Sequence, residues 1–186
     1  MSIQRKRKDL DIMKLRMQDF NIILINDSSN EFIVDFDGPK DTLYENGSWK
    51  VRILIPVKYP YKSPSIGFEN KIFHPNIDWK SGSVCLNVLN KHWSPMYDLV
   101  NIFQIFLPQL LTYPNIEDSL NICAGELMSK NLKLYNETVK DYVNKYARKQ
   151  NDCENDCEND CEDDCEDDCE DDLSSISSSF SNDFEF

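Results

Sequence analysis

The sequence has no long apolar run. Across its 186 residues nothing approaches the roughly 20 consecutive apolar residues that a membrane-spanning helix needs, so we expect no membrane-spanning segment. The basic cluster Arg5–Lys8 is followed by no apolar stretch, and a secretory signal is therefore not expected. Short basic clusters match nuclear addresses by chance so often that this one identifies no compartment.

Basic residues are missing altogether from residues 151–186, which carry 16 of the 33 acidic residues. The formal net charge of −13 therefore misdescribes the rest of the chain, since residues 1–150 have 17 acidic and 20 basic residues. Over residues 151–170 the unit NDCE occurs three times and DDCE twice. Like charges four residues apart disfavour a helix, by about 0.2–0.5 kcal/mol per pair. We predict one folded domain over residues 1–150 and a disordered, low-complexity acidic tail over residues 151–186.

The seven cysteines do not suggest a disulfide framework, because five of them recur every fourth residue in the acidic tail. Unpaired thiols at this density indicate a reducing compartment, so we expect the cytoplasm, the nucleus or both. Cys85 follows a loop that contains Gly82, and we expect it to be exposed. Cys123 lies between Ile122 and Ala124, and we expect it to be buried. The tail cysteines are Cys153, Cys157, Cys161, Cys165 and Cys169.

The first third of the chain predicts a helix and then three strands. Residues 4–18 have helical periodicity, and their apolar face is expected to pack in the core. Three runs rich in Ile, Val and aromatic residues predict strands at Phe20–Asn26, Glu31–Asp37 and Trp49–Val57. Because the links between them are short, an antiparallel meander is favoured. The apolar face of the helix consists of Leu10, Met13, Met17 and Phe20.

The remainder predicts irregular structure and then helices. Three prolines favour extended, irregular backbone from Tyr59 to Asn76. A helix is expected after Asp98, its N-cap, with a bend or shortening at Pro108. A last helix is expected at about Leu132 to Arg148, and the whole pattern indicates an α+β domain. The last helix is expected to bury Leu132, Tyr135, Val139, Tyr142, Val143 and Tyr146.

Three motifs between His74 and Pro95 indicate the family. They are His-Pro-Asn at 74–76, a Cys-Leu pair that begins at Cys85, and Trp-Ser-Pro at 93–95. In this order and spacing they resemble the ubiquitin-conjugating (E2) enzymes, and the resemblance covers roughly residues 5–148. It implies the UBC fold: an N-terminal helix, a four-stranded antiparallel meander sheet, an active-site loop region and C-terminal helices. Two further matching turns lie at Tyr59–Pro64 and Tyr113–Asn115.

The resemblance implies a transferase that accepts ubiquitin from an E1 activating enzyme as a thioester on Cys85. Ubiquitin then passes to a substrate lysine, with a RING-type E3 ligase as partner. A thiol suits this chemistry because it is a strong nucleophile and leaves readily. No bound cofactor is expected, since ATP is used by the E1 upstream, and no metal site, nucleic acid or membrane partner is expected.

Four side chains near Cys85 carry specific expectations. In the family pattern His74 is structural, and His92 is expected to be an exposed loop residue. The Asn76 amide has two candidate roles: it can stabilise the oxyanion formed when an amine attacks the thioester, or it can brace the loop through backbone hydrogen bonds. Asp118 matches the family's acidic residue that positions the acceptor lysine and assists its deprotonation.

The chain departs from the family pattern at two places beside the site. The family commonly has Asp two residues after the cysteine, where this chain has Asn87, and commonly has Pro where this chain has Ser119. An unpaired carboxylate favours the ammonium form of a nearby lysine, so burial of the acceptor must oppose Asp118. The loss of a carboxylate at Asn87 bears on how strongly the enzyme activates a free lysine.

Partner surfaces are implied by the same resemblance. The first helix is expected to meet the E1 and, in part, a ligase. The loops that begin at Pro60 and Ser94 are expected to dock a RING-type ligase. The residues concerned are Arg5, Lys6 and Lys8 on the helix and Pro60, Tyr61, Ser94, Pro95 and Met96 on the loops.

Within the family, three runs resemble the H-type conjugating enzymes, a subgroup with an acidic C-terminal tail. That resemblance implies ligases of the multisubunit CTLH type and basic substrates such as histones. The runs are Lys62–Phe68, Asn70–His74 and Phe106–Leu111.

Other functions fit the sequence less well. A cysteine protease would pair Cys85 with His74 or His92, but no orienting third residue is evident. Cysteines four residues apart lie within the spacing of zinc sites, so a thiol-rich, acidic metal-binding protein is one alternative. The repeat fixes no geometry, however, and ordering it costs about 1–2 kcal/mol per residue. A noncatalytic E2-like interaction protein is the other alternative, and the presence of Cys85 disfavours it.

Overall fold

The structure, a computed structural model, describes residues 3–25 and 28–148. The predicted acidic tail, its disorder and the domain boundary predicted at residue 150 lie outside the described residues. Among the residues described, no helix has the length and apolarity required to cross a membrane.

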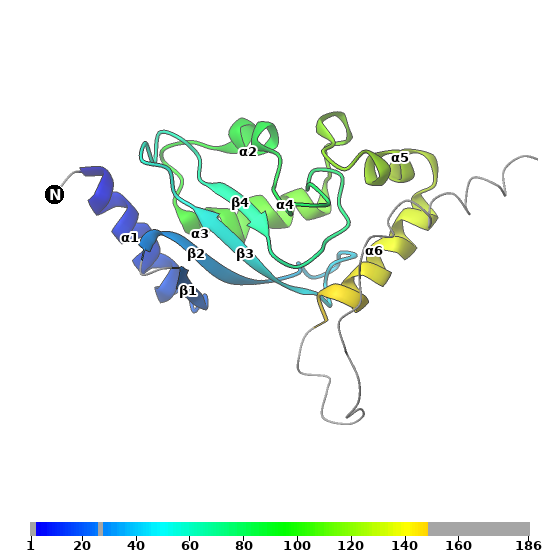
Figure 1. The fold of residues 1–186 in the computed structure, drawn as a ribbon, viewed down its shortest axis with the longest axis horizontal. Helices are drawn as coiled ribbons and strands as arrows, with labels where there is room; N and C mark the ends of the chain where they lie inside the picture. Colours follow the sequence, from blue (N-terminus) through cyan, green and yellow to red (C-terminus); the bar gives the residue numbers. More distant parts are fainter. Residues whose placement is uncertain (1–2, 26–27, 149–186) are drawn as a thin grey trace, which may run out of the picture. The chain divides into compact units, whose positions relative to one another are not determined.

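One antiparallel sheet with the strand order β1-β2-β3-β4 runs through the described part of the chain (Figure 1). The strands are β1 (Ile22–Ile25), β2 (Ser28–Asp37), β3 (Ser48–Leu54) and β4 (Ser65–Phe68). Each strand pairs with its neighbour in sequence, so the predicted meander is confirmed. The fourth strand lies within the segment where prolines favour irregular backbone. It is compatible with them because Pro64 precedes its first residue.

The inner face of the sheet forms the core with the helices behind it. Along β3, Val51 and Ile53 are fully buried, whereas Arg52 and Leu54 are exposed, as expected for a strand with one solvated face. Figure 1 shows the helical run of α3 and α4 passing behind the sheet. This run consists of α3 (Leu99–Asn101), the π-helical turn η1 (Ile102–Phe106) and α4 (Leu107–Thr112).

The helical run begins as predicted, and its helix type changes just before Pro108. Asp98 is its N-cap, and its carboxylate accepts a hydrogen bond from the backbone N–H of Asn101. Pro108 lies in the first turn of α4, directly after the π-helical turn. Proline has no N–H to donate, and a widened turn is one way in which a helix accommodates that missing donor.

The predicted core face of α1 (Ile3–Met17) is wrong at three of its four residues. The fourth, Phe20, lies after the helix and packs partly buried against the core. Leu10, Met13 and Met17 are 56–70% exposed, whereas Asp11 and Leu15 are fully buried. The buried face of the helix is rotated by about one residue from the predicted face. Because it contains a charged side chain, the apolar pattern predicted the neighbouring, exposed face as the core face. Three partners stabilise the Asp11 carboxylate: it pairs with Arg7 Nε at 2.8 Å and Lys14 Nζ at 3.7 Å and accepts from Tyr59 Oη at 2.6 Å.

The remaining helices are α2 (Leu86–His92), the 3₁₀ turn η2 (Ile116–Asp118), α5 (Ile122–Lys130) and α6 (Leu132–Tyr146). The last helix is found where it was predicted, and Tyr135, Val139 and Val143 are buried on it. Leu132 is 55% exposed, against expectation, and Tyr142 and Tyr146 are half-buried. Leu132 is the first residue after the N-cap Asn131, where its side chain faces solvent.

Candidate active site around Cys85

Backbone hydrogen bonds fix Cys85 at the start of α2. Its N–H donates to the carbonyl of Asn76 at 2.9 Å, and its own carbonyl accepts from the N–H of Leu89 at 3.1 Å. The preceding residue, Val84, donates to the carbonyl of Ile66 on β4 at 2.9 Å. Cys85 therefore lies where a segment tied to the sheet becomes the N-cap of a helix.

The two cysteines of the described chain have the opposite exposure from that expected. Cys85 is only 6% exposed, because it packs at the edge of the core at the first turn of α2. Cys123 is exposed, together with Ile122, whereas Ala124 is buried. Side chains of adjacent helix residues point in directions about 100° apart. The apolar neighbours Ile122 and Ala124 therefore do not imply that Cys123 is buried.

His74 is fully buried, and both of its ring nitrogens have partners. Nδ1 accepts from the backbone N–H of Asn76 at 3.0 Å, so the proton lies on Nε2, which donates to the carbonyl of Leu110 at 3.0 Å. Burial lowers the pKa of His74 to about 4. The ring is therefore neutral at pH 7, and neither nitrogen is free to act as a base. This is the environment expected of a structural histidine. His92, by contrast, is exposed at the end of α2.

Asn76 is fully buried and bridges to the loop that carries Asp118. Its Nδ2 donates to the carbonyls of Asn115, at 2.5 Å, and Asp118, at 3.1 Å, while its Oδ1 accepts from the N–H of Asn115 at 2.8 Å. Both amide hydrogens thus serve backbone carbonyls. In this arrangement Asn76 holds the loop in place through its side-chain hydrogen bonds. To donate to an oxyanion, the amide must first break its bond to one of the two carbonyls.

Residues 113–121 are held against the His-Pro-Asn segment by further backbone bonds. The carbonyl of Pro75 accepts from the N–H groups of Leu120, at 2.8 Å, and Asn121, at 3.0 Å. Ser119, where the family commonly has proline, donates its hydroxyl to the carbonyl of Ile116 at 2.7 Å and so closes the turn by a side-chain bond. The backbone of residues 75–76 therefore positions both Cys85 and the acidic turn.

Asp118 ends η2, and its carboxylate has two donors on one oxygen. Asn115 Nδ2 donates to Oδ2 at 2.9 Å, and Lys91 Nζ donates to the same oxygen at 2.5 Å. The hydrogen bond to Asp118 is the main cause that raises the pKa of Lys91. Lys91 lies on α2, six residues after Cys85, and no sequence motif singles it out. Asn87, on the same helix, is exposed.

The predicted partner residues form two adjoining loops beside α1. Trp93 Nε1 donates to the carbonyl of Pro60 at 2.8 Å, which joins the loop at 59–61 to the loop at 94–96. On these loops Tyr61 is 73% and Met96 is 87% exposed. Arg7 Nη2 on α1 donates to the carbonyl of Tyr97 at 3.0 Å, so the helix is attached to the second loop.

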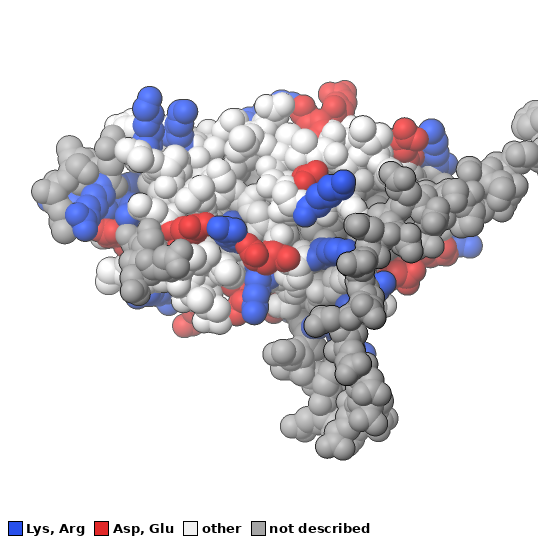
Figure 2. Space-filling model, in the orientation of Figure 1, with Lys and Arg blue, Asp and Glu red and all other residues white. Residues whose placement is uncertain are grey.

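The basic residues predicted to meet the E1 lie on α1. Arg5 and Lys6 are exposed, and Lys8 is half-buried with its Nζ donating to Asn30 Oδ1 at 2.6 Å. Figure 2 shows basic side chains at the α1 end of the molecule. The structure therefore brings together the helix and the two loops that the sequence assigned to partner binding.

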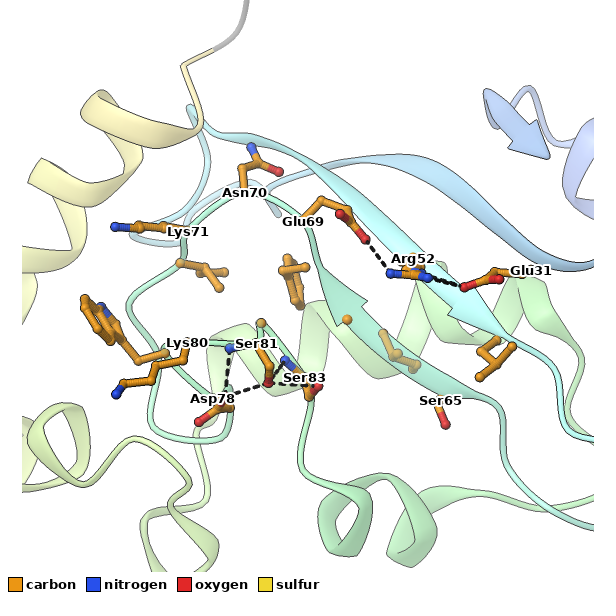
Figure 3. A pocket seen from close by; sticks show the side chains of 17 residues that line it. Glu31, Arg52, Ser65, Glu69, Asn70, Lys71, Asp78, Lys80, Ser81 and Ser83 are labelled. Atoms are coloured by element: carbon orange, nitrogen blue, oxygen red, sulfur yellow. Dashed lines mark hydrogen bonds and ion pairs between the residues drawn. The ribbon is translucent and has the colours of Figure 1, made fainter. Parts of the chain in front are cut away.

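A separate hollow of about 420 Å³ lies on the solvated face of β3 and β4 (Figure 3). Three of its charged side chains are paired with one another: Arg52 bonds to Glu31 and lies 3.8 Å from Glu69. Asp78 accepts from the N–H and hydroxyl of Ser81, which lowers its pKa. None of the predicted site residues lines this hollow.

Comparison with known proteins decides the family. The sequence profile of ubiquitin-conjugating enzymes matches residues 3–143. The chain belongs to the ubiquitin-conjugating enzyme family. It is 55% identical over 145 residues to "Ubiquitin-conjugating enzyme E2 5" of Arabidopsis thaliana, covering 78% of each chain. It is 56% identical over 145 residues to "Ubiquitin-conjugating enzyme E2-23 kDa" of Triticum aestivum, covering 78% of this chain and 79% of the relative.

Solved structures of ubiquitin-conjugating enzymes have the same fold. A putative ubiquitin-conjugating enzyme from Plasmodium yoelii superposes with a TM-score of 0.71 at 27% identity, over 80% of this chain and 98% of that one. The E2 domain of a Toxoplasma gondii ubiquitin-conjugating enzyme gives 0.70 at 26%, over 77% and 99%. The α+β UBC fold and the E2 transferase class predicted from the motifs are confirmed, and neither the metal-binding nor the noncatalytic alternative is favoured.

Proposed function

We propose that this ubiquitin-conjugating enzyme accepts ubiquitin from an E1 as a thioester on Cys85 and transfers it to a substrate lysine. The observation that carries the proposal is the Asn76 bridge. Its carbonyl accepts from the N–H of Cys85, while its side-chain amide makes three bonds to the loop that ends at Asp118. A thiol and a carboxylate 33 positions apart in the chain are thereby held on one scaffold.

The two steps need no cofactor bound to this chain. In the first, the Cys85 thiolate attacks the thioester carbonyl of the charged E1, and the E1 thiolate leaves. In the second, the acceptor amine attacks the carbonyl carbon on Cys85, an oxyanion forms transiently, and the C–S bond breaks to release the Cys85 thiolate. The acceptor ammonium must lose its protons for this second step. ATP is used by the E1 upstream.

We assign the second step to Asn76 and Asp118. Asn76 holds the acidic turn in place, and it also stabilises the oxyanion when one of its amide hydrogens exchanges from a loop carbonyl to the reacting oxygen. Asp118 positions the acceptor lysine beside Cys85. His74 keeps the His-Pro-Asn segment in register as a neutral, buried hydrogen-bonding group.

The docking roles rest on the joined loops. Tyr61 and Met96 are exposed apolar side chains on two loops that a hydrogen bond links, which is a surface of the kind that a RING-type E3 ligase needs. Arg5, Lys6 and Lys8 on α1 are assigned to the E1, with the ligase in part sharing this surface. Exposure of charged and apolar side chains at one end of the molecule supports this assignment.

We further propose that the acidic tail contacts a basic groove on a ligase or a substrate. Its composition supports this, because like charges on a chain raise the rate of encounter with an oppositely charged surface, and salt screens that effect. By resemblance to the H-type subgroup, a CTLH-type ligase and histones are the partners to test first. We also propose a location in the cytoplasm or the nucleus, because unpaired thiols at this density indicate a reducing compartment.

Thioester charging tests the proposed activity. The full-length protein is incubated with an E1, ATP and ubiquitin, and its intact mass is measured with and without a thiol reductant. The expected product is one added ubiquitin that reductant removes. A noncatalytic interaction protein gains no mass, and that result would contradict the proposal. Omission of ATP is the control, because the E1 then has no activated ubiquitin to pass on.

A further inference from the structure

The Asp118 carboxylate, proposed above to receive the acceptor lysine, is already occupied by a lysine of the same chain. Lys91 Nζ donates directly to Asp118 Oδ2 at 2.5 Å, shorter than the usual length of about 2.7–2.9 Å for a charge-assisted N–H···O hydrogen bond. Asn115 Nδ2 donates to the same oxygen at 2.9 Å. An incoming acceptor ammonium therefore meets a carboxylate whose charge is already balanced.

The position of Lys91 on α2 explains why its side chain reaches this site. Cys85 is the N-cap of α2, and Lys91 lies in its last turn. Side chains of a helix lean toward its N-terminus, so the Lys91 side chain runs back toward the end of the helix at which Cys85 lies.

We propose that Lys91 is an internal competitor for the acceptor lysine, which determines how strongly Asp118 holds an acceptor ammonium beside Cys85. The inference rests on the proposed function. Two consequences follow from neutralising the carboxylate. The attraction between the acceptor ammonium and Asp118 contributes less binding free energy, so a higher acceptor concentration is needed. Deprotonation of the bound ammonium also costs less free energy, since an unpaired carboxylate would favour the charged form.

The absence of a carboxylate at Asn87 increases the effect of this competition on acceptor binding. The family commonly places a second carboxylate two residues after the cysteine, whereas Asn87 supplies none. The acceptor therefore depends on Asp118, and displacement of Lys91 becomes part of acceptor binding. A substrate or ligase that offers Lys91 another acidic partner would release Asp118, which links acceptor selection to the docked partner.

The test measures discharge of the charged enzyme to free lysine as a function of lysine concentration. Lys91→Gln removes the ammonium, and because the Lys91 side chain is 58% exposed the variant should fold. We expect the KM for lysine to fall by about 1.5- to 5-fold, the range given by exposed ion pairs, while kcat does not rise. Lys91→Arg keeps the pairing and should restore the wild-type KM.

Three controls separate competition from a structural effect. Hydroxylamine, a nucleophile that is uncharged at neutral pH, should discharge wild type and Lys91→Gln equally. In an Asp118→Asn background, Lys91→Gln should cause no further change. Lys130→Gln is the matched lysine change, because Lys130 forms a 2.8 Å ion pair with Glu126 on α5, and it should leave the KM for lysine unaltered.

The outcomes distinguish this inference from the proposed function. If wild type is not charged at Cys85, both are overturned. If charging is normal but Lys91→Gln has the wild-type KM for lysine, the inference alone is overturned. An equal change with hydroxylamine, or a change that persists in Asp118→Asn, would also overturn it, because neither result involves competition for the carboxylate.

Discussion

Buried, neutral His74 makes the stability of the fold depend on pH in a specific direction. The ordinary pKa of histidine is 6.5, and burial lowers the pKa of His74 to about 4 in the folded protein. Between these values the unfolded chain binds a proton that the native ring does not, so stability rises with pH. The contribution is fully present above pH 6.5 and is lost as pH falls toward 4.

The expected magnitude follows from that pKa difference. A difference of about 2.5 units at 1.36 kcal/mol per unit gives about 3 kcal/mol, a large part of the 5–15 kcal/mol typical of a domain. His74→Gln removes the titrating group and should therefore lose about 3 kcal/mol less than wild type between pH 7 and pH 4. Acidic side chains that titrate in this range are common to both proteins and cancel in the comparison.

The assay is urea unfolding at a series of pH values, followed by tryptophan fluorescence. His92→Gln is the matched control, because His92 is exposed, and it should keep the wild-type pH dependence. Parallel curves of unfolding free energy against pH for wild type and His74→Gln would refute the reasoning, since the imidazole would then titrate alike in the folded and unfolded states.

Three further results are expected. Asn76→Ala should still be charged by the E1, since thiol exchange starts from an activated thioester, but its discharge to lysine should slow by about 10²–10³-fold; equal loss in both steps would instead indicate a collapsed loop. Met96→Ala should weaken ligase-stimulated discharge and leave discharge without ligase unchanged, and loss of both would contradict a docking role. A chain ending at Gln150 should charge normally yet lose ligase- or substrate-dependent transfer, most at low salt; identical rates across about 50–300 mM salt would rule out the tail contact.

The sequence predicted the meander, the helical run capped by Asp98 and the last helix, because local pattern and turn chemistry agree there. It failed at α1, where a buried Asp11 stabilised by Arg7, Lys14 and Tyr59 makes the true inner face look polar. Apolar periodicity carries no information on a buried charge that is compensated by Arg7 and Lys14 on the same helix and by Tyr59, 48 positions away. The exposed stripe of Leu10, Met13 and Met17 was therefore assigned to the core.

At the site, the sequence motifs predicted which residues take part, but only the tertiary structure shows which of them contact one another. The bonds from Asn76 to Asn115 and Asp118 join segments about 40 positions apart. The ion pair of Lys91 with Asp118 could not be anticipated, since a lysine on a short helix carries no signal. The exposure of the two cysteines was reversed for a related reason: packing of Cys85 against the core and the helix phase of Cys123, rather than neighbouring residues, determine which of them faces solvent.

The central claim is that Cys85 carries ubiquitin, and mapping the thioester by variants tests it most directly. Of the two cysteines that the structure describes, Cys123 is the more exposed, so it is the demanding control. With E1, ATP and ubiquitin, Cys85→Ala should give no reductant-sensitive adduct. Cys123→Ala, and a protein with serine at all five tail cysteines, should charge like wild type. A thioester that persists in Cys85→Ala, or that disappears with the tail cysteines, would contradict the account.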